Sequence, residues 1–134
     1  MNLNKKQLMQ IDTQIKRIIE TDSYYGKLYR ELGITGVSSQ KEFEAIPFSS
    51  KEELRNVYPL GIKVALEEKI VRIHSSSGTT GIPVIIPYTA KDVEDWSIMF
   101  GCYETANISK MDRIQITSGY GLWTAGIDFQ NGCD

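Results

Sequence analysis

Residues 70–86 read IVRIHSSSGTTGIPVII, in which two short β-branched runs flank a polar segment. Valine and isoleucine are enriched in strands, so Ile70–Ile73 and Val84–Ile86 predict two strands. Between them, residues 75–81 are all Ser, Thr or Gly, which favour neither strand nor helix. The sequence therefore predicts a loop held between two strands.

The two glycines of this loop point to anion binding. Gly78 and Gly81 can adopt positive φ because they lack a Cβ, which lets successive amide N–H groups converge. An inert surface loop is the alternative, but the loop is short and bracketed by strands. The predicted cradle suits an anionic oxygen cluster, above all a polyphosphate. The hydroxyl groups that could join the amides belong to Ser76, Ser77, Thr79 and Thr80.

The glycine spacing excludes a Walker-type phosphate loop. That motif needs four residues between its glycines, a Lys directly after the second, and a helix to follow. Here two residues separate Gly78 from Gly81, Ile82 follows, and the next element is a predicted strand. A P-loop kinase or GTPase is therefore excluded.

The N-terminal residues predict short helices. A helix ending near Thr21-Asp22 is expected to cover a core, with a coiled-coil partner helix as the alternative. A second helix, residues 27–32, would end at Gly33. Serine and glutamate three residues apart predict two further helix starts, at Ser39 with Glu42 and at Ser50 with Glu53. The apolar stripe of the first helix comprises Leu8, Ile11, Ile15, Ile18 and Ile19.

Downstream of the loop, Thr89 and Asp92 predict the start of a helix that reaches roughly Asn107. Arg113–Thr117 alternates polar and apolar residues, which predicts a half-buried strand. The fold class is α/β: a helical region, 1–66, then the start of a mixed sheet with flanking helices, 67–134, forming one partial domain. The inner stripe of the helix would be Val93, Trp96, Phe100 and Tyr103.

The composition narrows the function classes. The 134 residues are 41% hydrophobic and 24% charged, as in ordinary globular domains. Fifteen basic against 17 acidic residues give a net charge of −2, which disfavours nucleic-acid binding. The N-terminus lacks the continuous apolar run of a signal peptide or membrane span. Cys102 and Cys133 lack metal-binding spacing and are expected to be thiols in a reducing cytoplasm.

The string RIHSSSGTTGIP, residues 72–83, resembles the phosphate-binding signature of the adenylate-forming superfamily, which contains acyl-CoA synthetases and luciferases. The surrounding segments resemble phenylacetate-CoA ligases in particular, and the ordered matches cover nearly the whole chain. These segments are Tyr24-Tyr25, PFSSKEELR at 47–55, YPLG at 58–61, YTAKD at 88–92 and GYGLWT at 119–124.

The resemblance implies a reaction and its partners. A small aryl acid attacks the α-phosphate of ATP, pyrophosphate leaves, and the acyl group of the adenylate passes to coenzyme A. ATP with Mg²⁺ would bind at the phosphate loop, defined here as residues 75–82. Many superfamily members have a lysine near this loop, whereas Ile82 and Val84 stand here, so a cation would have to come from elsewhere. The phosphate-binding residues implied are Ser76, Ser77, Gly78, Thr79, Thr80 and Gly81.

Other polar and aromatic residues have competing interpretations. The resemblance implies that Tyr120, Gly121 and Trp123 line the acid pocket, with core packing as the alternative for the two aromatic side chains. His74, the only histidine, is expected to order the loop and not to transfer protons, because no carboxylate is close in sequence. The carboxylates of residues 92–95 fit the start of a helix better than a metal site.

The resemblance covers only the opening part of such an enzyme, an incomplete part of its large N-terminal domain, without its adenine-binding motif or catalytic lysine. We therefore expect no catalytic residue within this chain and no acyl-CoA synthesis by it alone. An unfinished sheet would favour self-association or a complementing C-terminal chain. The alternatives are a non-catalytic module that binds a nucleotide, an anion or a partner, and a helical interaction domain with an inert loop.

Overall fold

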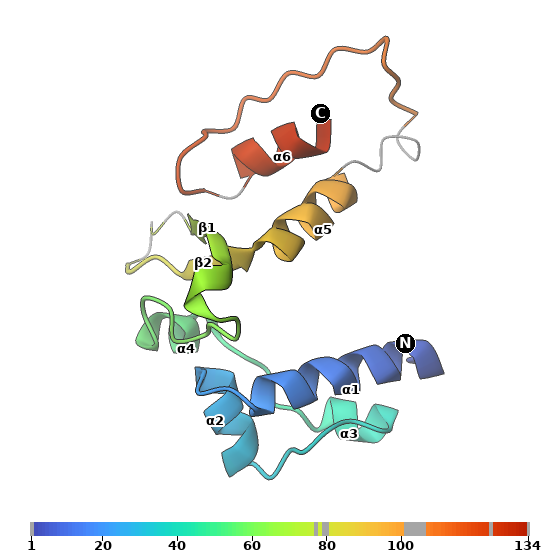
Figure 1. The fold of residues 1–134 in the computed structure, drawn as a ribbon, viewed down its shortest axis with the longest axis vertical. Helices are drawn as coiled ribbons and strands as arrows, with labels where there is room; N and C mark the ends of the chain where they lie inside the picture. Colours follow the sequence, from blue (N-terminus) through green and yellow to red (C-terminus); the bar gives the residue numbers. More distant parts are fainter. Residues whose placement is uncertain (1, 77, 79–80, 101–106, 124, 134) are drawn as a thin grey trace. The chain divides into compact units, whose positions relative to one another are not determined.

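The computed structural model describes residues 2–76, 78, 81–100, 107–123 and 125–133. The chain forms two compact units, Met1–Val64 and Ala65–Asp134 (Figure 1). Within the described residues lie six α-helices, one 3₁₀ helix and a two-stranded antiparallel sheet. The predicted combination of helices and strands is confirmed, whereas the assignment to the large domain of an adenylate-forming enzyme stays a prediction.

The first unit is helical, and each of its helices begins at a polar cap. The Ser50 side chain accepts a hydrogen bond from the Glu53 N–H and the Glu53 side chain reaches back, so the predicted capping box is confirmed. Ser39 caps through the Glu42 N–H, as predicted. The remaining two caps are Asn4 and Ser23. The helices are α1 Lys5–Ile19, α2 Tyr24–Glu31, α3 Gln40–Glu44 and α4 Lys51–Asn56.

The first two helices differ from the prediction at their shared boundary. Ser23 accepts a hydrogen bond from the Gly26 N–H at 3.1 Å, so α2 begins three residues earlier than Lys27 and α1 ends before Thr21. Helix α2 lies so close to the end of α1 that a Cβ at Gly26 would be 2.3 Å from the Thr21 carbonyl oxygen. Gly33 ends α2 with φ of 69°, the left-handed conformation expected there.

The second unit contains the sheet. Strands β1 Ile70–Ser75 and β2 Ile85–Thr89 pair antiparallel, which confirms both predicted strands. A 3₁₀ turn, Glu67–Lys69, precedes β1. Helix α5 Ala90–Phe100 follows β2 directly and packs against both strands and against α6 Ala125–Cys133 (Figure 1). Helix α5 therefore packs on the sheet, which fits the α/β prediction, whereas the start of a mixed sheet with flanking helices stays a prediction.

Two predictions for the second unit need correction. Arg113–Thr117 is not a strand: it belongs to an irregular segment, residues 107–123, and pairs with no strand among the described residues. Alternating polarity describes the two faces of a strand, but a strand forms only where a neighbour supplies its hydrogen bonds. Helix α5 ends at Phe100, and its predicted continuation through residues 101–106 lies outside the described residues.

Over the described ranges, no helix is both long and apolar enough to cross a membrane.

Candidate functional site

The phosphate loop is closed at its base by two hydrogen bonds. The Ser76 N–H donates to the Val84 carbonyl oxygen, and the Val84 N–H donates to the Ser76 hydroxyl oxygen, both at 2.9 Å. The Ser76 hydroxyl accepts in this pair, so its own hydrogen can still be donated to a ligand. These two bonds thereby hold the two ends of the loop together.

Both glycines of the loop have positive φ, 64° at Gly78 and 129° at Gly81. The Gly81 N–H donates to the Gly78 carbonyl oxygen at 3.0 Å, which makes a tight turn at the tip. A Cβ at Gly78 would lie 3.2 Å from the Gly81 carbonyl oxygen, whereas one at Gly81 would meet nothing within 4 Å. The conformation at Gly81 is thus strained for any other residue even though space is open.

The remaining predicted loop residues, Ser77, Thr79 and Thr80, lie outside the described residues. Phosphate binding by the six predicted residues therefore stays a prediction. The described backbone is compatible with an anion, because residues 75–84 contain no carboxylate that would repel it.

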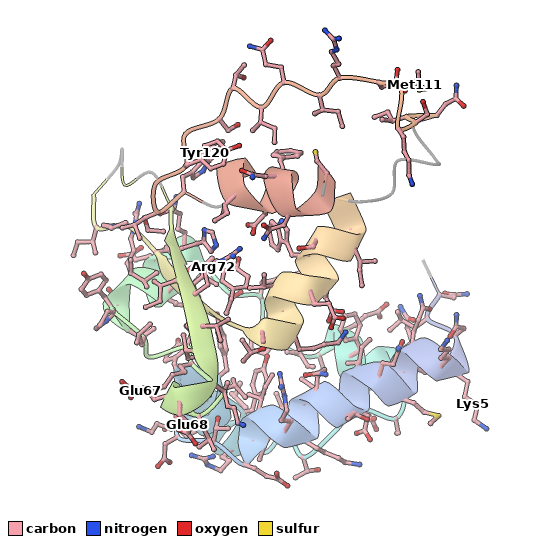
Figure 2. All side chains as sticks on the ribbon, turned by 45° about the horizontal axis from the view of Figure 1, so that its top comes forward. Lys5, Glu67, Glu68, Arg72, Met111 and Tyr120 are labelled. Carbon is pink, nitrogen blue, oxygen red and sulfur yellow. The ribbon has the colours of Figure 1, made fainter. Side chains whose placement is uncertain are left out.

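The predicted pocket segment, residues 119–126, lies next to the start of the phosphate loop. The Ser75 N–H donates to the Leu122 carbonyl oxygen at 2.7 Å. Tyr120 and Trp123 expose 53% and 50% of their surface, so neither is part of the core of the second unit. Figure 2 labels Tyr120. The structure thus brings together the two segments that sequence reasoning singled out, while the role of Tyr120, Gly121 and Trp123 in binding an acid stays a prediction.

Directly before the loop lies a group of polar residues whose association sequence reasoning missed, here called the buried cluster: Arg72, His74 and Asp128. Arg72 on β1 (labelled in Figure 2) donates from Nη1 to Asp128 Oδ1 at 3.0 Å. His74 Nε2 is 3.8 Å from Asp128 Oδ2, and these two side chains are 3% and 4% exposed. No carboxylate is close to His74 in sequence, but the fold supplies one, because α6 brings in Asp128 from far along the chain.

Aromatic side chains continue from this cluster into the unit. The His74 ring meets Tyr88 edge to face at 5.1 Å, and Tyr88 meets Trp96 in the same way at 5.9 Å. Burial raises the pKa of the Tyr88 hydroxyl above its ordinary value of 10.0, and the negative charge of Asp128 adds to this. Tyr88 is therefore a neutral phenol at physiological pH, and packing holds the histidine.

The acidic residues at the start of α5 have local partners. Asp92 Oδ2 accepts hydrogen bonds from the N–H and the hydroxyl of Thr89, at 2.8 and 2.7 Å, so the predicted cap is confirmed. Lys91 Nζ pairs with Glu94 at 3.0 Å and with Asp95 at 2.8 Å, and all three side chains are exposed. Within the described part of the chain, no three His, Cys, Asp or Glu side chains gather in a way that could hold a metal ion.

The sequence was compared with known proteins. No protein-family model matches it. Phenylacetate-coenzyme A ligases from Aromatoleum evansii and Pseudomonas putida are 31% and 30% identical to it over 98% of the chain. A phenylacetate-coenzyme A ligase from Thermus thermophilus is 29% identical over 92% of the chain. The match extends over 29–31% of the length of each of these relatives. The chain therefore belongs to the phenylacetate-coenzyme A ligase family and corresponds to about 30% of the length of the members it matches.

Proposed function

We propose that the chain provides the ATP-phosphate-binding loop of an acid–coenzyme A ligase that acts on phenylacetate or a related small aryl acid. The observation that carries this proposal is the closed loop between β1 and β2, with two left-handed glycines at its tip. The likeness to phenylacetate-coenzyme A ligases supplies the reaction class.

The loop fits the demands of this reaction. When the acid carboxylate attacks the α-phosphate of ATP, pyrophosphate is the leaving group, so the protein must hold the β- and γ-phosphates and stabilise their charge. Backbone N–H groups and the Ser76 hydroxyl would donate to the phosphate oxygens without any protein nucleophile. No residue from 75 to 84 is cationic, so Mg²⁺ and a cation from outside this segment would neutralise the remaining charge.

The pocket segment would hold the acid beside the phosphates. The hydrogen bond from Ser75 to Leu122 supports this, because it keeps the segment at the start of the phosphate loop. Tyr120 and Trp123 offer flat apolar surfaces to an aryl ring, and a Cβ at Gly121 would meet nothing within 4 Å.

Ligand titration of the purified chain tests the loop. We expect Mg-ATP and Mg-pyrophosphate to bind, and the double change Gly78→Val and Gly81→Val to weaken both by about tenfold or more, since each lost hydrogen bond to a charged group costs about 1.5–3 kcal/mol. Gly33→Val is the control, because it places a valine at a glycine of positive φ in the other unit. Equal affinities of the double variant and the unaltered chain would refute phosphate binding by this loop.

A non-catalytic nucleotide-binding module is the second candidate, because the closed loop by itself offers donors for phosphate. Acid-dependent exchange of pyrophosphate into ATP tests this candidate, because exchange requires the acyl-adenylate that a ligase forms. We propose that the chain alone binds nucleotide but supports no exchange. Robust exchange with phenylacetate would reject the non-catalytic candidate.

A further inference from the structure

We propose that Asp128 is a positioning residue for the phosphate loop: from α6 it holds Arg72 and His74, and so fixes the point at which β1 passes into the loop. The link to phosphate rests on the proposed function. The structural link between α6 and the end of β1 can be tested without it.

The faces of β1 provide the first argument. Arg72 and His74 are two residues apart, so they share one face of the strand, and this face is turned inward. Val71 and Ile73 occupy the other face and are 61% and 42% exposed. A strand that turns Arg72 and His74 inward while Val71 and Ile73 are exposed needs a polar partner inside, since charge buried alone is costly.

Asp128 supplies that partner. Its carboxylate is almost fully buried, with Oδ1 bound to Arg72 and Oδ2 nearest to His74. His74 Nδ1 is buried and has no hydrogen-bond partner among the described residues. Within the described part of the chain, this ring lies beside the Asp128 carboxylate and meets Tyr88 edge to face. The carboxylate is therefore the polar group that orients the ring.

The cluster lies where the two ligand-binding segments meet. His74 is followed directly by Ser75, whose N–H binds the Leu122 carbonyl oxygen. Leu122 leads into α6, and Gly126 in the first turn of that helix lies against Gly119, since a Cβ at Gly126 would be 2.5 Å from the Gly119 carbonyl oxygen. Helix α6 thus holds the end of β1 at two points, through Asp128 and through the pocket segment.

The consequence is a coupling between acid and phosphate sites. Any displacement of α6 would move the Ser75 attachment and the Asp128 attachment together, and with them the start of the phosphate loop at Ser75 and Ser76. Loss of the Asp128 charge releases one of the two attachments, so the loop would spend less time in the geometry that binds phosphate.

The first test needs no ligand. His74 is the only histidine, so its ring nitrogens give a single set of NMR signals. Asp128→Asn, which keeps the shape of the side chain and removes its charge, should shift the ¹⁵N signals of this ring and the amide signals of Ser75 and Ser76. Asp95→Asn, an exposed change on α5, should leave them in place. Unchanged signals in Asp128→Asn would overturn the proposal. If Asp128→Asn does not fold, Arg72→Lys replaces it, because lysine keeps a cation beside the carboxylate. The NMR signals should then shift by a smaller amount, and unchanged signals in Arg72→Lys would overturn the proposal.

The second test measures function. Mg-pyrophosphate should bind Asp128→Asn about tenfold more weakly than the unaltered chain, which is a common size for the coupling between linked sites. It should bind Asp95→Asn with unaltered affinity. Equal binding by Asp128→Asn would overturn the positioning role even if the NMR signals move. If the unaltered chain binds neither pyrophosphate nor ATP, the proposed function fails, and the ligand-free signals alone decide whether Asp128 fixes the end of β1.

Discussion

The two units of the chain are stabilised in different ways. In Met1–Val64 each helix begins at a side chain that accepts a hydrogen bond from an N–H three residues ahead, so its start is fixed within one turn of chain. In Ala65–Asp134 the decisive polar contact joins Arg72 to Asp128, which are 56 residues apart. Contacts of the first kind can be read from sequence, whereas those of the second kind appear only once the chain is folded.

Removing the distant contact should have the largest effect. Asp128→Ala leaves Arg72 without its partner in a mostly buried site, which we expect to lower the free energy of unfolding of the second unit by about 3 kcal/mol. Both tryptophans, Trp96 and Trp123, belong to this unit, so denaturant unfolding followed by their fluorescence reports on it. Asp112→Ala, at an exposed turn, is the control, and a loss of less than about 1 kcal/mol in Asp128→Ala would contradict the importance of the buried cluster.

A substitution where α1 and α2 approach closely should have the second largest effect on stability. Gly26→Ala places a Cβ against the backbone oxygens of Thr21 and Ile18, which cannot move aside, so we expect a loss of about 2 kcal/mol. Gly33→Ala introduces only the strain of positive φ, because a Cβ there meets no other atom. It should lower the free energy of unfolding by about 1 kcal/mol. Helix content measured by circular dichroism during thermal unfolding would compare them, and a greater loss in Gly33→Ala would show that packing between the helices is loose.

A single cap should matter less. Ser50→Ala removes the acceptor for the Glu53 N–H at the start of α4 and should destabilise the first unit by about 1 kcal/mol. The neighbouring Ser49→Ala, which leaves the cap intact, should have almost no effect. Chemical denaturation of both variants checks this, and equal midpoints would mean that α4 does not depend on its cap.

Lowering the pH should change the stability of the first unit least. Hydrogen bonds from the Ser50 hydroxyl and N–H hold the pKa of Glu53 below its ordinary value of 4.5. The stabilisation is therefore complete above that value and is lost as the pH falls through the lower pKa of the folded state. A titration of helix content below about pH 5 should be flatter for Glu53→Gln than for the unaltered chain. Superimposable curves would rule out a contribution from this carboxylate.

What could be predicted from the sequence follows the same division. The caps at Ser39, Ser50 and Thr89 were found because their partners lie three residues away. Helix α6 was missed, since its glycines give a weak helical signal and its packing against α5 stabilises it. Arg113–Thr117 has the alternation of a strand but no neighbouring strand in the described structure to pair with.

The candidate site shows this limit as well. The glycine positions predicted a turn that could bind an anion, and both glycines do have positive φ. Asp128 could not be assigned to His74, because nothing local marks a carboxylate that arrives from another helix. A strand that buries Arg72 and His74 while exposing Val71 and Ile73 is a signal that, in retrospect, points to a charged partner.

The exposed side of β1 also bears on how the strand chooses its alignment with β2. A slip of one residue would turn Val71 and Ile73 inward and push Arg72 and His74 into water. If only buried apolar surface mattered, the slipped pairing would be the more stable of the two. The carboxylate of Asp128 favours the observed alignment, because only there can it neutralise Arg72. The pair of Arg72 and Asp128 therefore favours one of two possible strand alignments. The favoured alignment buries less apolar surface but leaves the strand in a single arrangement.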